Sequence, residues 1–491
     1  MNAAGELLGA AALARHGERT ALTCGAESIS YESLARRVRR AARCYADAGV
    51  APGERVLILL RDTPDYAAAW LGAVWRGAVA VGLNNKLPDD DLRFIAADSG
   101  ARVLVTEPAL ARDIGPRVIL AAELNGGREG MAPAAGPAER PAFWLYSSGT
   151  TGRPKGIIHA HRSILAAGQA QREVLGLAAG DCVLATSKLF FAYALENGLL
   201  GPLSLGASVV LSPDWAETGA ICELAARHAP DAFFSVPSFY RKLLALPRER
   251  LAAFGSVRRF VAAGERLPSQ LVDAWRAVTG GEILSIYGMS ETFCVAMLTR
   301  PGTSTGTHTG APIAGVQAKI LDANDAQVPD GDTGVLWVRH PALALGYANL
   351  PQRTREQFRD GWFCTKDMFV RDAACAYAHQ GRADDLLKVA GQWVRPSVVE
   401  DAAMAAPAVA DAACVPVPDA DGLERLALFV AGSGDAQAAM SAAGEACDRA
   451  LARHERPKWI RAVPELPRTA TGKVQRFRLR EMLEREFARK D

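Results

Sequence analysis

The sequence predicts an α/β fold, with a large N-terminal multi-sheet α/β domain and a smaller C-terminal α+β domain. The chain has 491 residues, more than the roughly 100–200 of one ordinary domain. It is 49% hydrophobic and 22% charged, which is typical of a protein that buries a large core. Apolar runs alternate with amphipathic stretches, a pattern that favours parallel strands joined by helices. Near residues 381–396 the pattern of apolar runs changes to one typical of a compact α+β domain. We therefore predict domains at 1–383 and 384–491.

Two amphipathic helices and one strand are predicted near the N-terminus. Residues 30–49 place apolar side chains at helical spacing, and Ser30 can cap the start while Gly49 can end the helix. Residues 54–60 (ERVLILL) are typical of a buried strand. Residues 63–77 predict a second helix, with threonine as the cap, proline at the first position and glycine after the end.

Six further apolar runs are predicted as strands: 101–107, 142–148, 207–213, 231–238, 258–265 and 281–291. Four of them run into small or polar residues, namely SSGTTG, SVPS, AAGE and YGMSE. Ligands of open α/β sheets bind beyond the carboxyl ends of the strands. We therefore expect these four strand ends to share one crevice.

Composition excludes several classes of function. The 56 Lys and Arg against 54 Asp and Glu leave a net charge of +2, which gives no support for nucleic-acid binding. The nine cysteines are odd in number and form no CxxC pair, which indicates reduced thiols rather than disulfides or a zinc site. Residues 1–19 make a poor signal peptide, and no run approaches ~18 apolar residues, so we expect a cytoplasmic protein without a membrane partner.

The stretch 146–156, YSSGTTGRPKG, follows a predicted strand and is rich in glycine and hydroxyl residues. It matches neither the G-x-x-x-x-G-K-[ST] phosphate loop nor the G-x-G-x-x-G dinucleotide loop. Its residue types still suit a phosphate, because glycines let the backbone approach, hydroxyls donate and Lys155 adds a positive charge. A plain structural turn is the alternative at this point.

The whole string resembles the signature loop of the adenylate-forming enzymes, the superfamily of acyl-CoA synthetases, peptide-synthetase adenylation domains and luciferases. Four more stretches resemble that superfamily's motifs in its order: YGMSE (287–291), GWFCTKD (361–367), GRADDLLKVAGQWVRPSVVE (381–400) and PRTATGKVQRFRLR (467–480). The resemblance covers nearly the whole chain. Within the superfamily, residues 188–211 and 234–244 most resemble benzoate- and aminobenzoate-type aryl-CoA ligases.

The resemblance implies ATP and Mg²⁺ as cofactors of a first half-reaction that joins a carboxylate to the α-phosphate. Lys473 would contact both the carboxylate and the α-phosphate, with Ser290 and Glu291 as the other catalytic residues and Glu291 as the Mg²⁺ ligand. The implied nucleotide-binding residues are Ser147, Ser148, Gly149, Thr150, Thr151, Gly152 and Lys155 at the phosphates, Gly264, Glu265 and Tyr287 at adenine, and Asp367 and Arg382 at ribose or phosphate.

A second half-reaction with coenzyme A is also implied. The C-terminal domain would rotate about Asp384, replacing the Lys473 loop with the hairpin 387–396. Gly391 in that hairpin would leave room for the pantetheine arm. The resemblance thus makes the C-terminal domain mobile.

The aromatic acid would lie in a flat, mostly apolar slot formed by Phe191, Ala192, Tyr193, Val236 and Gly288, with Cys294 nearby. We expect Phe190 or Phe191 to belong to the core. Two positions depart from the ligases' pattern, because Cys294 stands in place of a common histidine and Glu196 in place of a glycine. A smaller, less polar Cys294 leaves space for a ring substituent, so we expect a substituted benzoate or related cyclic acid.

The sequence therefore predicts an AMP-forming aryl-CoA ligase whose partners are an aromatic carboxylic acid, ATP and CoA, with a homodimer as an open alternative to a single chain. Two other functions stay open: an aryl-acid adenylating enzyme that loads a carrier protein's phosphopantetheine thiol, and a non-catalytic nucleotide or acid sensor. His159 and His161 flank the loop, and we expect them to begin the next helix without a role in catalysis.

Overall fold

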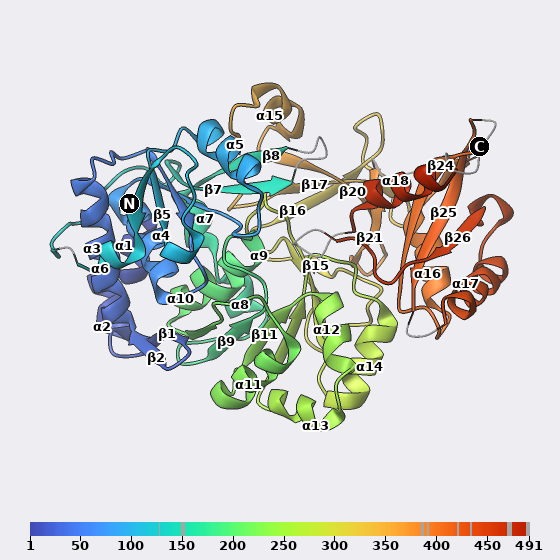
Figure 1. Cartoon of the computed structure of the whole chain (residues 1–491), viewed down its shortest axis with the longest axis horizontal. Helices are drawn as coiled ribbons and strands as arrows, with labels where there is room; N and C mark the ends of the chain where they lie inside the picture. The colour runs from blue at the N-terminus through green and yellow to red at the C-terminus, as the bar shows by residue number, and fades with distance from the viewer. Residues whose placement is uncertain are drawn as a thin grey trace. The chain divides into compact units, whose positions relative to one another are not determined.

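The structure is a computed structural model that describes residues 1–126, 128–148, 153–383, 387–389, 392–419, 422–432, 435–468 and 474–487. The chain forms two compact units (Figure 1). The first consists of Met1–Ala318 and Val338–Cys364, and the second of Lys319–Trp337 and Thr365–Asp491.

Within the described residues, the first unit holds a nine-stranded sheet in the order β15-β14-β13-β12-β11-β9-β10-β1-β2. Neighbouring residues Phe233 and Phe234 of β11 point to opposite faces and enter different cores. One face is covered by α11 (Thr218–His228), α12 (Pro237–Leu244) and α14 (Ser269–Thr279) (Figure 1). The strands are β1 (Thr20–Cys24), β2 (Glu27–Ser30), β9 (Cys182–Ala185), β10 (Ser208–Leu211), β11 (Ala232–Ser235), β12 (Arg259–Ala262), β13 (Ile283–Tyr287), β14 (Met297–Leu298) and β15 (Ala311–Pro312).

A seven-stranded sheet in the order β18-β8-β7-β4-β3-β5-β6 makes up the rest of the described core of this unit. Its largest core lies under α3 (Tyr31–Asp47) and α4 (Pro64–Arg76), and α5 (Asp89–Ser99) packs on the opposite face. The strands are β3 (Arg55–Leu59), β4 (Val79–Gly82), β5 (Val103–Thr106), β6 (Arg117–Leu120), β7 (Pro141–Ser148), β8 (Pro154–Ala160) and β18 (Gly346–Tyr347).

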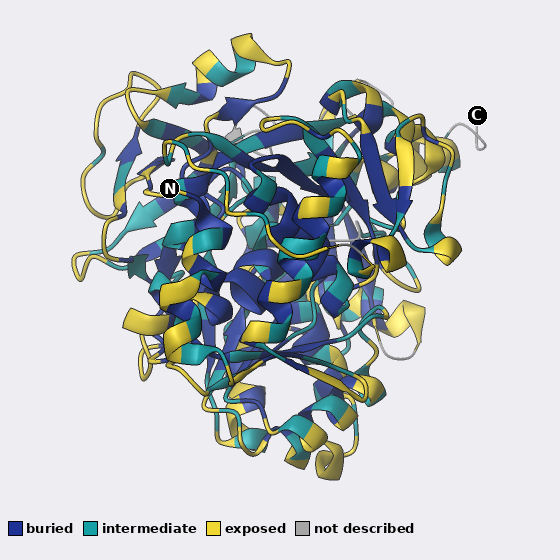
Figure 2. Ribbon diagram, turned by 90° about the vertical axis from the view of Figure 1, so that its left-hand side faces the viewer, coloured by how far each residue is buried: buried dark blue, intermediate teal, exposed yellow. Residues whose placement is uncertain are grey.

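The other described helices of the first unit are short. They are α1 (Ala3–Leu8), α2 (Ala10–His16), α6 (Ala121–Asn125), α7 (His161–Ala166), α8 (Gln169–Glu173), α9 (Ala192–Leu195), α10 (Gly201–Leu205), α13 (Arg248–Leu251) and α15 (Pro351–Gln357), the 3₁₀-helices η1 (Pro108–Leu110) and η3 (Ala252–Phe254), and the π-helix η2 (Glu196–Leu200). The strands of both large sheets are mostly buried, whereas exposed residues lie on helix faces and loops (Figure 2).

The second unit contains a three-stranded sheet, β24 (Asp411–Pro418), β25 (Glu424–Ala431) and β26 (Trp459–Ala462). Helices α16 (Pro396–Met404) and α17 (Ala436–Ala450) cover one face, and α18 (Arg476–Phe487) covers the other. Strands β22 (Leu387–Val389) and β23 (Gln392–Val394) pair as an antiparallel hairpin. The 3₁₀-helix η5 covers Arg453–Glu455.

A further five-stranded sheet has the order β16-β17-β20-β19, with β21 also beside β20. Its strands are β16 (Gln317–Leu321), β17 (Thr333–Arg339), β19 (Phe358–Arg359), β20 (Trp362–Arg371) and β21 (Tyr377–Arg382). The chain passes from one unit to the other within β16, β17 and β20.

The predicted α/β class is confirmed, as are the early elements. Helix α3 begins after Ser30, whose hydroxyl accepts a hydrogen bond from the Ser33 N–H. Helix α4 ends at Gly77, which has the left-handed φ of 80° that a glycine adopts without strain. The boundary between residues 383 and 384 stays a prediction.

Candidate functional site

Three of the four predicted crevice segments follow neighbouring parallel strands of the nine-stranded sheet, whereas SSGTTG follows β7 of the seven-stranded sheet. Strand β12 lies between β11 and β13, with Ala262 beside Ser235 on one side and Ser285 on the other. Because the three strands are parallel, the segments after them begin at the same edge of the sheet. The structure therefore brings SVPS, AAGE and YGMSE together.

Lys155 of the Gly/Ser/Thr-rich stretch contacts Glu291 of YGMSE directly. The Lys155 Nζ donates to Glu291 Oε1 at 2.7 Å, and the Tyr347 hydroxyl donates to the same oxygen at 2.9 Å. Burial alone would raise the pKa of Glu291, but the charge of Lys155 and these hydrogen bonds lower it below its usual value. Glu291 is therefore ionised at neutral pH although it is buried.

The buried side chain of His159 contacts the YGMSE segment. Its Nε2 is 2.7 Å from the carbonyl oxygen of Ser290, and its ring stacks on Phe143 with 4.8 Å between centroids. The prediction that His159 begins a helix is wrong, because it lies within strand β8, while His161 does begin α7. The structural role of His159 was missed because its partner is 131 residues away in the sequence.

Phe293, just after the YGMSE segment, has a left-handed backbone with φ of 58°. A bulky residue rarely adopts this conformation, and such strain is concentrated at functional sites. The Phe293 ring packs edge-on against Phe143 at 4.8 Å, which holds the turn in place. The turn directs the following Cys294 into the core, where it is 2% exposed.

The predicted adenine-lining residues lie at these strand ends. Tyr287 is the last residue of β13 and is half-buried, whereas Gly264 is exposed with φ of 85°. A Cβ at Gly264 would lie 3.8 Å from Val236. The Glu265 carboxylate accepts hydrogen bonds from the N–H and hydroxyl of Ser238 at 3.1 and 2.8 Å, so it caps the start of α12.

The predicted acid slot begins with the residues before and in α9. Phe190 is buried in the core, as expected for one of the two phenylalanines, and Phe191 and Ala192 are partly exposed. The Tyr193 hydroxyl donates to the carbonyl oxygens of Ser235 and Val261 at 3.1 and 3.3 Å. These bonds fix α9 against the ends of β11 and β12.

Gly288 and Cys294, two further residues of the predicted acid slot, are in close contact. A Cβ at Gly288 would lie 3.3 Å from the Cys294 carbonyl oxygen, so glycine keeps this approach open. The Cys294 thiol is 3.6 Å from the carbonyl oxygen of Ser163. The first unit therefore brings the predicted slot residues Tyr193, Val236, Gly288 and Cys294 to the strand ends that carry Tyr287 and Glu291.

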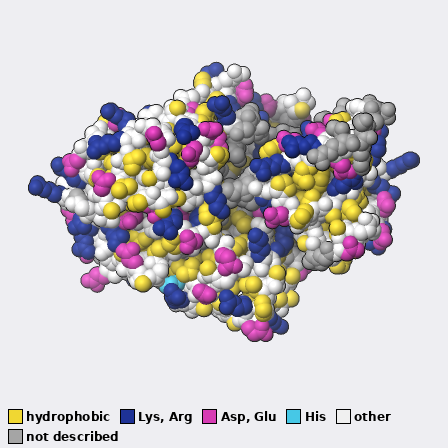
Figure 3. All heavy atoms as spheres, in the orientation of Figure 1, with side chains coloured by type: hydrophobic (Ala, Val, Ile, Leu, Met, Phe, Trp, Pro, Cys, Tyr) yellow, Lys and Arg dark blue, Asp and Glu magenta, His cyan; other side chains and the backbone are white. Residues whose placement is uncertain are grey.

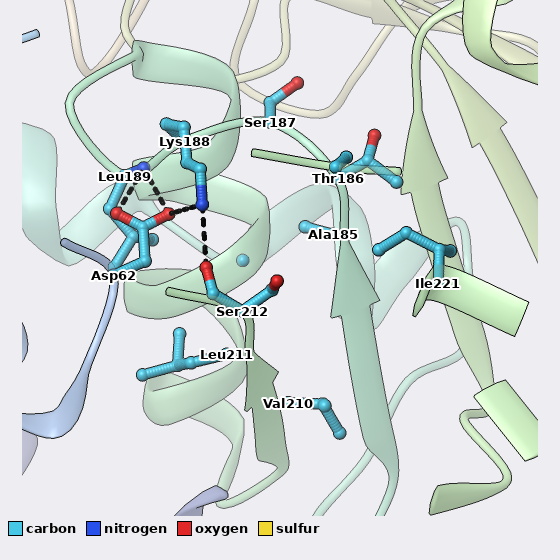
Figure 4. A pocket seen from close by; sticks show the side chains of 12 residues that line it. Asp62, Ala185, Thr186, Ser187, Lys188, Leu189, Val210, Leu211, Ser212 and Ile221 are labelled. Atoms are coloured by element: carbon cyan, nitrogen blue, oxygen red, sulfur yellow. Dashed lines mark hydrogen bonds and ion pairs between the residues drawn. The ribbon is translucent and has the colours of Figure 1, made fainter. Parts of the chain in front are cut away.

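A buried ion pair holds the beginning of the aryl-ligase-like stretch (Figure 4). Lys188 Nζ is 3.7 Å from Asp62 Oδ2 and donates to the Ser212 carbonyl oxygen at 2.7 Å, while the Leu189 N–H donates to Asp62 at 3.2 Å. Burial raises the pKa of Asp62 to about 6 despite the nearby lysine. These residues border a cavity of about 10 Å³, roughly the space that one water needs.

In the second unit, Asp367 and Arg382 stand opposite each other on β20 and β21. Arg382 Nη1 donates to Asp367 Oδ1 at 3.1 Å, and Asp367 is 7% exposed. Lys366, the residue before Asp367, has a φ of 60°. This left-handed backbone favours glycine, so it is strained at a lysine.

Several predicted residues lie outside the described part of the chain: Gly149, Thr150, Thr151, Gly152, Asp384, Gly391 and Lys473. Ser148 ends strand β7, and its side chain is not described. The Ser147 hydroxyl is buried and has no hydrogen-bond partner among the described residues. A buried hydroxyl donor in this position suits an anionic ligand.

Basic and acidic side chains are interspersed over the molecular face in Figure 3, in keeping with the balanced composition. In the described ranges, no helix combines the length and apolar character that crossing a bilayer requires. The same ranges contain no cluster of three or more His, Cys, Asp or Glu side chains arranged for a metal ion.

Comparison with known protein families shows to which family these motifs belong. Residues 10–348 match the AMP-binding enzyme family, and residues 398–473 match the AMP-binding enzyme C-terminal domain. The chain belongs to the AMP-binding enzyme family. The predicted resemblance to the adenylate-forming superfamily is thereby confirmed.

The relatives of this AMP-binding enzyme include aryl-CoA ligases over their full length. It is 38% identical to the 3-hydroxybenzoate–CoA/4-hydroxybenzoate–CoA ligase of Thauera aromatica, over 99% of this chain and 98% of that one. It is 34% identical to the benzoate–CoA ligase of the same organism, over 98% and 95%. Among solved structures, the anthranilate CoA ligase AuaEII in complex with anthranoyl-AMP superimposes with a TM-score of 0.92 at 31% identity, over 98% and 97% of the two chains. The resemblance to the aryl-CoA ligase branch, with its large α/β domain and smaller C-terminal domain, is confirmed.

Proposed function

We propose that this AMP-binding enzyme is an ATP-dependent aryl-CoA ligase that activates a substituted benzoate-type acid. The observation that carries the proposal is the contact between Lys155 and Glu291 at 2.7 Å, at the strand ends where the predicted acid slot lies. It joins the phosphate-loop lysine to the carboxylate of YGMSE. The aromatic acids named for its full-length relatives support the choice of substrate class.

In the first half-reaction, a carboxylate oxygen of the acid attacks the α-phosphorus of ATP and the bond to pyrophosphate breaks. Both reactants are anions, so positive charge placed where they meet stabilises the transition state. We assign Lys473 to that position and Lys155, with the loop 147–155, to the β- and γ-phosphates. Tyr287 stacks on adenine. Asp367, which is paired with Arg382, accepts hydrogen bonds from the ribose hydroxyls.

The donor set fits Mg²⁺ at Glu291. The carboxylate is ionised, buried and held in place by Lys155 and Tyr347, with the Ser290 hydroxyl one residue before it. Mg²⁺ commonly uses one or two protein carboxylates, waters and substrate phosphates, so the absence of a larger cluster in the described residues agrees with such a site. An ion bound there would neutralise part of the phosphate charge. The role of Lys155 and Tyr347 is to keep the Glu291 carboxylate ionised and in place.

In the second half-reaction, the thiol of coenzyme A attacks the carbonyl carbon of the acyl-adenylate and AMP leaves. We propose that residues 384–491 form a lid that rotates about Asp384 for this step and that Gly391 borders the pantetheine arm. A carrier-protein thiol is the second candidate acceptor. Comparing thioester formation with free CoA and with a phosphopantetheinylated carrier protein separates the two.

Substitution of Lys473 tests the mechanism. In Lys473→Ala, acid-dependent ATP–pyrophosphate exchange falls about 100-fold or more, because the charge between the two anions is lost. ATP binding, measured by equilibrium titration, changes only a few-fold. Lys458→Ala, an exposed lysine paired with Asp419, is the matched control and leaves exchange unchanged. Full exchange activity in Lys473→Ala would refute the mechanism, and exchange driven by fatty acids rather than aromatic acids would refute the substrate class.

A further inference from the structure

Glu196 is a buried carboxyl at the first position of the π-helix η2, which continues directly from α9. Short π-helical segments inside helices often mark functional sites. Tyr193 of the acid slot lies three residues earlier, and side chains at this spacing share a helix face. Asn197 joins the two, since its amide donates to the Tyr193 carbonyl oxygen and to Glu196 Oε2, both at 3.0 Å.

The Glu196 carboxyl contacts the segment around Cys294, which borders the predicted acid slot. The N–H of Val295 donates to Glu196 Oε1 at 3.1 Å, and the Cys294 thiol lies beside the same carboxyl. The Cys294 carbonyl in turn lies against Gly288. Glu196 is therefore in direct contact with a wall of the slot and is only three residues from Tyr193.

No ion pair in the described part of the chain joins Glu196 to a lysine or arginine, although the residue is only 3% exposed. Burying a carboxyl without a cation is costly, and burial raises its pKa to about 7. A carboxylate accepts about four hydrogen bonds, and two donors among the described residues bond to it here: the Val295 N–H and the Asn197 amide. A neutral glutamine would satisfy the Val295 N–H at lower cost, so the carboxyl indicates a further partner that the described residues do not supply.

We propose that Glu196 is a specificity-determining residue whose carboxyl, beside Cys294, accepts a hydrogen bond from a hydroxyl or amino group on the ring of the acid. The inference rests on the proposed aryl-CoA ligase activity and narrows its substrate class to benzoate-type acids that carry a ring hydrogen-bond donor. A buried acceptor discriminates strongly, because an acid without the donor leaves it unpaired.

The test compares benzoate with the three monohydroxy-, three monoamino- and three monomethylbenzoates. A methyl group is close to a hydroxyl or amino group in size but donates no hydrogen bond. The wild-type chain prefers a hydroxy or amino isomer over the methyl isomer at one ring position by about ten-fold or more in kcat/KM for thioester formation. In Glu196→Gln this preference shrinks by a similar factor, chiefly through KM. Glu173→Gln, at an exposed glutamate of α8, keeps it.

Equal kcat/KM values for donor and methyl isomers at all three positions would overturn the inference, as would a preference that survives in Glu196→Gln. The wild-type comparison alone decides the matter if Glu196→Gln does not fold. The proposed function fails separately, since it requires that at least one aromatic acid drives ATP–pyrophosphate exchange.

Discussion

Glu291 and Lys155 form the contact on which the proposed chemistry depends. Each is mostly withdrawn from water, with side chains 10% and 14% exposed. Breaking such a pair by removing one charge is more harmful than losing an exposed pair, because the remaining charge stays buried without a partner. The pair therefore links the stability of the site to the proposed binding of phosphate and metal.

Neutralising Glu291 should disable adenylation. In Glu291→Gln, the shape and the hydrogen bond from Tyr347 are retained, but the charge is lost. We expect pyrophosphate exchange to fall about 100-fold, with a higher Mg²⁺ concentration needed for half-maximal rate. Initial rates over a Mg²⁺ titration measure both effects. Glu173→Gln is the control, and a variant with wild-type rate and Mg²⁺ dependence would remove Glu291 from the mechanism.

Buried histidines make the fold sensitive to acid. The Ala342 N–H donates to His340 Nδ1 at 2.8 Å, and His340 Nε2 lies 3.0 Å from the Val295 carbonyl oxygen, so the neutral ring satisfies both partners. Burial and the charge of Arg162 lower the pKa of His340 to about 4, against 6.5 in the unfolded chain. The unfolded state then binds the proton first, so this contribution to stability is complete above pH 6.5 and is lost as the pH falls towards 4.

The His340→Asn variant should weaken this acid sensitivity. Asparagine keeps an acceptor for Ala342 and cannot be protonated, so the stability that wild type loses between pH 7 and 4, about 3 kcal/mol from this residue, is not lost. At pH 7 the variant is about 1 kcal/mol less stable, because the bond to Val295 is missing. Urea unfolding at several pH values gives both quantities. Parallel stability curves for the two proteins would contradict the prediction.

Among the elements, the first part of the aryl-ligase-like stretch 188–211 is held by two contacts. The ion pair of Lys188 with Asp62 fixes its beginning against the loops after β3 and β10. Tyr193 fixes α9 against β11 and β12. The predicted slot residues Phe191 and Ala192 lie between these two contacts, and the Phe191 N–H also donates to the Lys188 carbonyl oxygen at 2.9 Å.

Removing the lysine of this anchor should be more harmful than removing the whole pair. Lys188→Met leaves Asp62 buried and unpaired, with an expected loss of about 3–5 kcal/mol of unfolding free energy. The double variant Asp62→Asn with Lys188→Met loses less, because no charge remains buried. Urea unfolding of the wild type, the two single variants and the double variant gives the coupling free energy of the pair. Asp90→Asn, which breaks an exposed pair with Arg93, is the control and changes stability by less than about 0.5 kcal/mol. Additive losses in the double variant would show that the ion pair is not coupled.

At the scale of the whole molecule, two compact units carry different parts of the proposed chemistry. The first contains Lys155, Glu291 and the residues of the predicted acid slot, and the second contains Asp367 and Arg382. We propose that the two half-reactions use different arrangements of the C-terminal region, with the chain turning at Asp384. Restricting the backbone at that residue should therefore separate the half-reactions.

Asp384→Pro tests the rotation, because proline fixes φ near −65° and limits rotation at one residue. Acid-dependent pyrophosphate exchange stays within about three-fold of wild type, whereas CoA thioester formation falls at least about 100-fold, the cost expected when reacting groups are misplaced. Asp384→Ala, which keeps backbone freedom, is the matched control and retains both activities. Equal loss of both half-reactions in Asp384→Pro would argue against a hinge at this position.

The α/β class, the early helices with the Ser30 cap, and membership of the adenylate-forming superfamily could all be predicted from the sequence alone, whereas the Thr63 side chain makes no capping hydrogen bond. These follow from local rules: hydrophobic period, capping residues such as Ser30, and motifs such as 146–156 and 287–291 whose residue types suit phosphate and carboxylate chemistry.

Only the tertiary structure decided which side chains meet. Lys155 and Glu291 are 136 residues apart in the chain, and His159 reaches Ser290 over 131 residues. Glu196 accepts a hydrogen bond from the Val295 N–H over 99 residues. No local pattern encodes such pairs, because they arise where the ends of strands from different parts of the chain are brought together by burial of the sheets.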